Sequence, residues 1–207
     1  MVSPLGAARR VLLALLLAAA PASADDRVIA VLGDSLSAGL GVAADEAYPT
    51  LLESRLRRAG FAYRVVNAGV SGDTSAGGLR RLDWVLRSRP EIVIVALGAN
   101  DGLRGLPVAA LRDNLTAIVT KLQATGVRVL LVGMRVPPNY GDAYASAFAE
   151  TFRDVARRTS AAFVPFLLDG VAGDARLNQA DGIHPNAAGH RAVAEHIWSS
   201  LQPLLRR

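Results

Sequence analysis

Two residues near the carboxyl end of the chain have the types and spacing of an acid–base pair. Asp181 precedes His184 by three positions in the stretch Asp181–Asn186. A carboxylate at that spacing can reach Nδ1 of the ring and fix its tautomer, which leaves Nε2 free to accept a proton. The alternative is that Asp181 only caps a turn and His184 is solvated. Because the chain has no cysteine, the nucleophile for such a base would have to be a hydroxyl.

Ser35 is the candidate nucleophile. It lies in the stretch Gly33–Ser37, directly after a short apolar run. This position predicts a strand-to-helix turn, where a hydroxyl meets the amide-rich start of a helix and developing negative charge is favoured. The alternative is that Ser35 is simply the helix N-cap, a common role for serine at such a turn.

Asn100 and Gly72 could supply hydrogen bonds to an oxyanion. Asn100 offers a side-chain amide and Gly72 a backbone N–H that no side chain obstructs, and each follows an apolar run. Acyl transfer needs donors that point at the forming oxyanion. Each residue alone is an ordinary loop residue. Together with a serine and an acid–histidine pair, they indicate serine-dependent acyl transfer.

The elements that must position these residues alternate along the chain. Short, β-branched apolar runs without alternation are typical of strands that are buried on both faces. Such runs cover residues 28–32, 64–67, 92–97 and 127–132, with a weaker fifth at 162–166 that Pro165 marks as an edge or strand end. Helical periods cover residues 48–59, 79–86, 107–122, 144–160 and 186–201. This alternation predicts an α/β fold with a mostly parallel, five-stranded sheet, whose site forms outside the carboxyl ends of the strands.

Composition excludes several classes of protein. With 51% hydrophobic and 20% charged residues, the chain is not disordered. The absence of cysteine excludes a disulfide scaffold and thiolate metal sites. The net charge of +5 comes from arginines that occur singly or in pairs among acidic and apolar residues, not from one basic face. We therefore expect no nucleic-acid partner.

Residues 1–24 are predicted to be a secretory signal peptide. Arg9 and Arg10 precede an apolar run over residues 11–20, and Ala22, Ser23 and Ala24 provide a small-x-small cleavage site. The alternative is a membrane anchor, but a helix over that run would be about 15 Å long and could not cross a core of about 30 Å. The expectation is an exported protein, periplasmic or secreted, with a single domain over residues 25–207 and no stable membrane anchor.

The four polar stretches resemble the four sequence blocks of the SGNH, or GDSL, hydrolase family. Gly33–Ser37 resembles the nucleophile block, Ser71–Thr74 the second, Gly98–Asp101 the third, and Asp181–Asn186 the block that holds acid and base. The resemblance implies a three-layer, flavodoxin-like sandwich and hydrolysis without metal or cofactor. The implied catalytic residues are Ser35, Asp181 and His184, and the implied oxyanion donors are Ser35, Gly72 and Asn100.

Three other acidic residues lie near these blocks. We expect Asp34 and Asp73 to brace turns and loops, and Asp101 is the less favoured alternative for the catalytic acid. In this family the nucleophile does not lie in Gly-x-Ser-x-Gly, and Ser35 does not either. This argues against the ordinary α/β-hydrolase fold.

Two further stretches, residues 99–105 and 138–144, resemble small exported bacterial arylesterases, acyl-CoA thioesterases and lysophospholipases. This subgroup implies a small-molecule ester or thioester substrate, and we expect a monomer. Apolar loop residues are the predicted walls for the acyl chain: Leu103, Leu106, Pro137, Pro138 and Tyr140. One alternative is a carbohydrate O-deacetylase, which would share the triad but require sugar-stacking residues. Another is a catalytically silent binding domain, which would require a broken triad.

Overall fold

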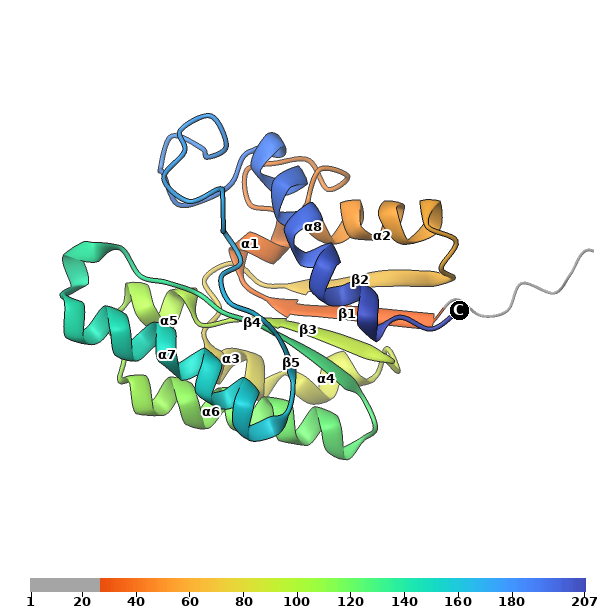
Figure 1. Ribbon diagram of the computed structural model, residues 1–207, viewed down its shortest axis with the longest axis horizontal. Coiled ribbons are helices and arrows are strands. Elements are labelled where there is room, and N and C mark those ends of the chain that lie inside the picture. Colours follow the sequence, from red (N-terminus) through yellow and green to blue (C-terminus); the bar gives the residue numbers. More distant parts are fainter. Residues whose placement is uncertain (1–26) are drawn as a thin grey trace, which may run out of the picture.

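The computed structural model describes residues 27–207. Within this range, five strands form a parallel sheet in the order β2-β1-β3-β4-β5 (Figure 1). The strands are β1 (Arg27–Gly33), β2 (Tyr63–Gly69), β3 (Ile92–Ala96), β4 (Arg128–Val132) and β5 (Ala162–Val164). Each overlaps a strand expected from the sequence, so the predicted α/β fold with a five-stranded sheet is confirmed.

Helices cover both faces of the sheet (Figure 1). One face carries α1 (Ser35–Ala38), α2 (Tyr48–Arg58) and α8 (Ala187–Leu201). The other carries α3 (Ser75–Arg80), α4 (Leu82–Leu86), α5 (Ala99–Leu103), α6 (Val108–Ala124) and α7 (Asp142–Thr159). Two short 3-10 helices complete the described part, η1 (Pro138–Tyr140) and η2 (Gln202–Leu204). The result is a three-layer sandwich.

The core lies on both sides of the central strands. All of β3 is buried, and β1 is buried after its first residue, because helices cover both of their faces. This is why the two strands read as continuous apolar runs. The edge strand β2 is different, since it exposes Arg64 and Asn67. The leucine, isoleucine and valine side chains of the helices complete the core from both sides.

The helices differ from the expected ones in two ways. The predicted helix over residues 79–86 is two helices, because the chain leaves helical geometry at Arg81, whose φ and ψ are −99° and 9°. The short helices α1 and α5 were not predicted, since a single turn has too few residues to show a period. Both start within three residues of a strand end and carry Ser35 and Asn100. The predicted secretory signal at residues 1–24 lies outside the described residues. From residue 27 onward, no helix is long and apolar enough to span a bilayer.

Candidate active site

Ser35 is the first residue of α1, immediately after the turn that ends β1. Asp34, not Ser35, is the N-cap, and its Oδ1 accepts a hydrogen bond of 3.0 Å from the N–H of Leu36. The alternative reading of Ser35 as a cap is therefore wrong. The Ser35 hydroxyl is free of the backbone, and its Oγ lies 2.9 Å from Nε2 of His184.

Asp181 holds the other side of the histidine ring. Its Oδ2 lies 2.7 Å from Nδ1 of His184, while its Oδ1 accepts the N–H groups of Ile183 and His184, each at 3.0 Å. The side-chain bond from His184, followed by these backbone N–H groups, lowers the pKa of Asp181 to about 2. The carboxylate is thus charged at neutral pH, and it both shapes the turn and orients the ring.

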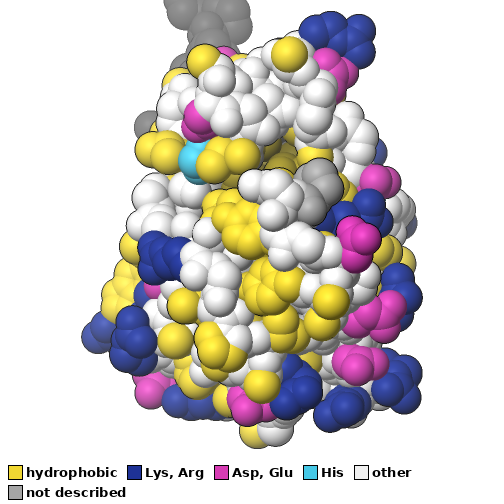
Figure 2. All heavy atoms as spheres, turned by 90° about the vertical axis from the view of Figure 1, so that its left-hand side faces the viewer, with side chains coloured by type: hydrophobic (Ala, Val, Ile, Leu, Met, Phe, Trp, Pro, Cys, Tyr) yellow, Lys and Arg dark blue, Asp and Glu magenta, His cyan; other side chains and the backbone are white. Residues whose placement is uncertain are grey.

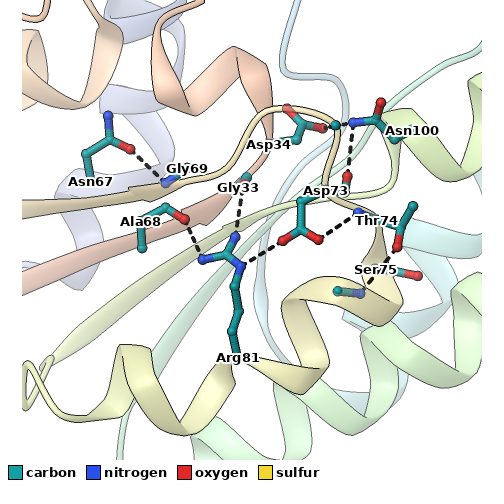
Figure 3. A network of polar contacts seen from close by, with 12 residues as sticks. Gly33, Asp34, Asn67, Ala68, Gly69, Asp73, Thr74, Ser75, Arg81 and Asn100 are labelled. Atoms are coloured by element: carbon teal, nitrogen blue, oxygen red, sulfur yellow. Dashed lines mark hydrogen bonds and ion pairs between the residues drawn. The ribbon is translucent and has the colours of Figure 1, made fainter.

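Asn100 and Gly72 lie beside this serine. The Nδ2 of Asn100 donates to the carbonyl of Asp73 at 2.9 Å and is 3.5 Å from Oδ2 of Asp34 (Figure 3). Gly72 has a φ of +77°, a conformation that favours glycine. Ser35, Gly72, Asn100 and His184 all line one cavity. Residues from four distant parts of the sequence therefore meet at the carboxyl ends of the strands.

The other carboxylates near the site have separate partners. Asp101 is buried, and its two oxygens accept the N–H and the hydroxyl of Ser75, at 2.8 and 2.5 Å. Bound to the start of α3, Asp101 makes no hydrogen bond to His184, whose Nδ1 lies against Asp181. Burial raises the pKa of Asp34 to about 6, although the N–H of Leu36 and the charge of His184 oppose this shift.

A cavity of about 680 Å³ opens beside Ser35, and most of its lining is apolar. Figure 2 shows hydrophobic side chains gathered around a histidine on the face at the carboxyl ends of the strands. Six large apolar wall residues were not predicted: Leu36, Leu40, Met134, Phe166, Leu168 and Ile183. For Leu36 and Ile183, the available sequence signal was that they are adjacent to Ser35 and His184. Leu40 follows Ser35 by five positions, and the remaining three come from segments that are distant in sequence.

The cavity includes only some of the residues that were predicted as acyl-chain walls. Leu103 and Pro137 line the cavity, whereas Leu106 and Tyr140 do not. The Tyr140 hydroxyl donates to the carbonyl of Leu103 at 2.7 Å, so this side chain holds the loop from outside the cavity. The carbonyl of Leu106 is held in the same way by the hydroxyl of Tyr144, at 3.0 Å. The side chain of Pro138 lies outside the described part of the structure.

Comparison with known proteins places this site in a family. The sequence matches the GDSL-like lipase/acylhydrolase family over residues 31–192. This chain belongs to that family. Esterase TesA of Pseudomonas aeruginosa is 47% identical over 180 residues, which are 86% of this chain and 90% of that protein. The family assigned from the four sequence blocks is confirmed.

Two other relatives support the same class of enzyme. Thioesterase 1/protease 1/lysophospholipase L1 of Escherichia coli K12 is 38% identical over 185 residues, which are 89% of this chain and 87% of that protein. The crystal structure of the psychrotrophic esterase EstA from Pseudoalteromonas sp., inhibited by monoethylphosphonate, has a TM-score of 0.82 and 37% identity, and the match covers 86% of this chain and 98% of that one. The protein is a carboxylic ester hydrolase.

A buried histidine in α8 makes the stability of the fold depend on pH. His190 is 1% exposed, its ring stacks on Tyr48, and its Nδ1 accepts the N–H of Tyr48 at 3.3 Å. Burial lowers the pKa of His190 from 6.5 to about 4. Between these values the unfolded chain binds the proton more readily than the folded one, so acid removes stability.

We expect His190→Gln to reveal this effect in urea unfolding at pH 7 and pH 4.5. From pH 7 to pH 4.5, the free energy of unfolding of the wild type should fall by about 2–3 kcal/mol more than that of the variant. Asp34 acts in the opposite direction, because a raised carboxyl pKa favours the folded state in acid. That contribution is common to both proteins and cancels in the difference. A difference that stays constant with pH would show that His190 does not titrate in this way.

Proposed function

We propose that this protein hydrolyses acyl esters and thioesters through a covalent acyl-enzyme on Ser35. The observation that carries the proposal is the chain of contacts from Ser35 through His184 to Asp181, which lies at the wall of an apolar cavity. A serine, a base and an orienting carboxylate in this order are the parts needed for nucleophilic catalysis.

Each residue has one role in the proposed reaction. Nε2 of His184 takes the hydroxyl proton as Ser35 attacks the carbonyl carbon, and Asp181 stabilises the imidazolium that forms. His184 then gives the proton to the leaving alcohol or thiol. A water molecule repeats the sequence on the acyl-enzyme and releases the acid, which regenerates the Ser35 hydroxyl.

Three donors are proposed to hold the oxyanion of the tetrahedral intermediate. The N–H of Ser35 is at the first position of α1 and has no acceptor within the helix. The N–H of Gly72 is the second donor. An amide nitrogen has two hydrogens, and Nδ2 of Asn100 gives one to the carbonyl of Asp73. The other faces only the 3.5 Å contact with Asp34, which leaves it available to the oxyanion.

The lining of the cavity favours an acyl chain over a sugar. Most of its walls are leucine, methionine, phenylalanine, proline and isoleucine side chains, and Ser71, Arg135 and Asn178 are the polar residues there apart from those of the proposed reaction, whereas a carbohydrate deacetylase would need a more polar lining. The relatives named esterase and thioesterase/lysophospholipase suggest esters, thioesters and lysophospholipids as candidate substrates. The subgroup that residues 99–105 and 138–144 resemble adds aryl esters and acyl-CoA to these candidates. A silent binding domain would require a broken triad, and all three residue types are present here.

Organisation and location complete the proposal. We propose that residues 1–24 direct export and are then removed, and that residues 25–207 act as a single, monomeric domain. Support for export comes from the basic, apolar and small-residue segments of the sequence described above.

A series of p-nitrophenyl esters from acetyl to dodecanoyl tests the proposed substrate class. We expect kcat/KM to rise with chain length over several carbons and to level off where the cavity ends. Each buried methylene contributes about 0.8 kcal/mol, or up to fourfold in affinity. A preference for acetyl, with loss already at butyryl, would instead support the deacetylase.

Leu103 and Leu106 provide a matched pair of variants for this series. Both are 37% exposed, and Leu103 ends α5 while Leu106 lies three residues later, but only Leu103 lines the cavity. Leu103→Ala should therefore flatten the rise with chain length, while Leu106→Ala should leave the profile as in the wild type. A flatter profile in both variants would mean that the loop as a whole, not its contact with the acyl chain, sets the preference.

A further inference from the structure

A partly buried ion pair lies directly behind the proposed oxyanion donors. Nε of Arg81 is 2.7 Å from Oδ2 of Asp73, and the two side chains are only 19% and 12% exposed. The remaining nitrogens of the guanidinium donate to two backbone carbonyls, at 2.6 Å to Ala68 and at 2.8 Å to Gly33 (Figure 3). One side chain therefore joins the end of β1, the end of β2 and the loop that carries Gly72.

Local sequence explains how Arg81 reaches this place. It occupies the break between α3 and α4, and its side chain points from there to the strand ends (Figure 3). Gly77 allows α3 to lie against Asp73, because a Cβ at that position would be 1.7 Å from Oδ1 of Asp73. Gly78 has the same function toward Leu97, which a Cβ would meet at 2.1 Å. The two glycines weaken the helix but permit the ion pair.

Asp73 connects this ion pair to the donors. Its Oδ1 accepts the N–H of Thr74 at 3.0 Å, and its carbonyl accepts Nδ2 of Asn100 at 2.9 Å. Its own N–H donates to the carbonyl of Val70 at 3.0 Å, which closes the turn around Gly72. A shift of Asp73 would therefore move the backbone N–H of Gly72 and the amide of Asn100 together.

The carbonyl of Gly33 links the same network to the nucleophile. It accepts both the N–H of Val70, at 3.0 Å, and Nη2 of Arg81, at 2.8 Å. Gly33 ends β1, two residues before Ser35. The loop that carries Gly72 and the strand end that precedes Ser35 are thus joined at the carbonyl of Gly33. Arg81 also donates to this carbonyl and stabilises the junction.

We propose that Arg81 is a positioning residue that sets the oxyanion donors relative to Ser35. This inference rests on the proposed function. The planar guanidinium donates in three directions at fixed angles, which an ammonium group cannot reproduce. Arg81 does not line the cavity, so it acts on the reaction through Asp73 and Gly33 and not through the substrate.

Steady-state kinetics of Arg81→Lys and Arg81→Met test the proposal, with rates normalised to the folded fraction measured by circular dichroism. We expect kcat to fall about tenfold to a hundredfold and KM to change less than about threefold, because the donors act mainly in the transition state. The double variant with Asn100→Ala should lose less than the product of the two single losses, since both changes affect the same donors. If the double variant lost the full product of the two single losses, the two residues would act independently and the proposal would be wrong.

Arg128 and Glu91 form the matched control. Their ion pair, at the amino ends of the strands, has side chains that are 23% and 25% exposed. Arg128→Lys should keep kcat within about twofold of the wild type. If it lost as much kcat as Arg81→Lys does, the loss would reflect a general need for such an arginine in the fold and not the positioning of the oxyanion donors. If Arg81→Met does not fold, Asp73→Asn removes the charge of the pair while keeping its shape, and the same loss in kcat is expected.

The test also separates this inference from the proposed function. If Arg81→Lys keeps the wild-type kcat while Ser35→Ala is inactive, only the positioning role fails. If Ser35→Ala retains full activity, the acyl-enzyme mechanism itself fails, whatever Arg81 does.

Discussion

Ser35→Ala will lower kcat/KM by about 10³- to 10⁶-fold and leave the protein folded. The substitution removes only a hydroxyl whose contact is Nε2 of His184. Ser35 is not the helix cap, and alanine is well tolerated within a helix, so stability should change little. Hydrolysis of a short aryl ester and a thermal unfolding curve, both compared with the wild type, measure the two parts of the prediction.

Covalent labelling identifies the nucleophile independently of the rate. An organophosphonate should modify Ser35 in the wild type and should leave Ser35→Ala unlabelled, as judged by peptide mass spectrometry. Three other serines lie near the site and serve as internal controls: Ser37, Ser71 and Ser75. A label on any of these three, with Ser35 free, would reject the assignment.

Asn100→Ala will lower kcat by about 10²- to 10³-fold with little change in KM. The amide hydrogen that is not bonded to the carbonyl of Asp73 is expected to bond the oxyanion in the transition state, so its loss should not weaken binding of the substrate itself. Steady-state kinetics with one aryl ester separate the two constants.

Asn114 provides a control for the general cost of losing an amide. Its Nδ2 donates to the hydroxyl of Ser75 at 3.0 Å, and it does not line the cavity. Asn114→Ala should therefore keep kcat within a few fold of the wild type once the folded fraction is taken into account. If Asn100→Ala raised KM alone, Asn100 would be a substrate-binding residue and the oxyanion assignment would be wrong.

The sheet could be predicted from the sequence because the pattern that specifies it is local. Residues 92–97 form an unbroken apolar run, and β3 within it is buried on both faces, which is what such a run requires. The contact between Asp181 and His184 was predictable for the same reason, since a spacing of three positions limits how far apart two side chains can lie. Ser35 and Asn100 could be placed at the strand ends from the runs that precede them.

The sequence by itself thus determined the α/β class, the family and the residues that meet at the edge of the sheet. Tertiary structure alone decided which neighbour each side chain contacts there. Leu106 and Tyr140 have the apolar character of acyl-chain walls, but neither lines the cavity, and the hydroxyl of Tyr140 is bonded to the carbonyl of Leu103 at the end of α5.

Phe166, distant in sequence from Ser35, lies in the wall instead. Arg81 lies within the helical period predicted over residues 79–86. The structure shows that it separates two helices and donates to carbonyls at two strand ends. The contacts of side chains such as Phe166 and Arg81 depend on segments that are distant in sequence. A local pattern of residues does not contain the information that brings these segments together.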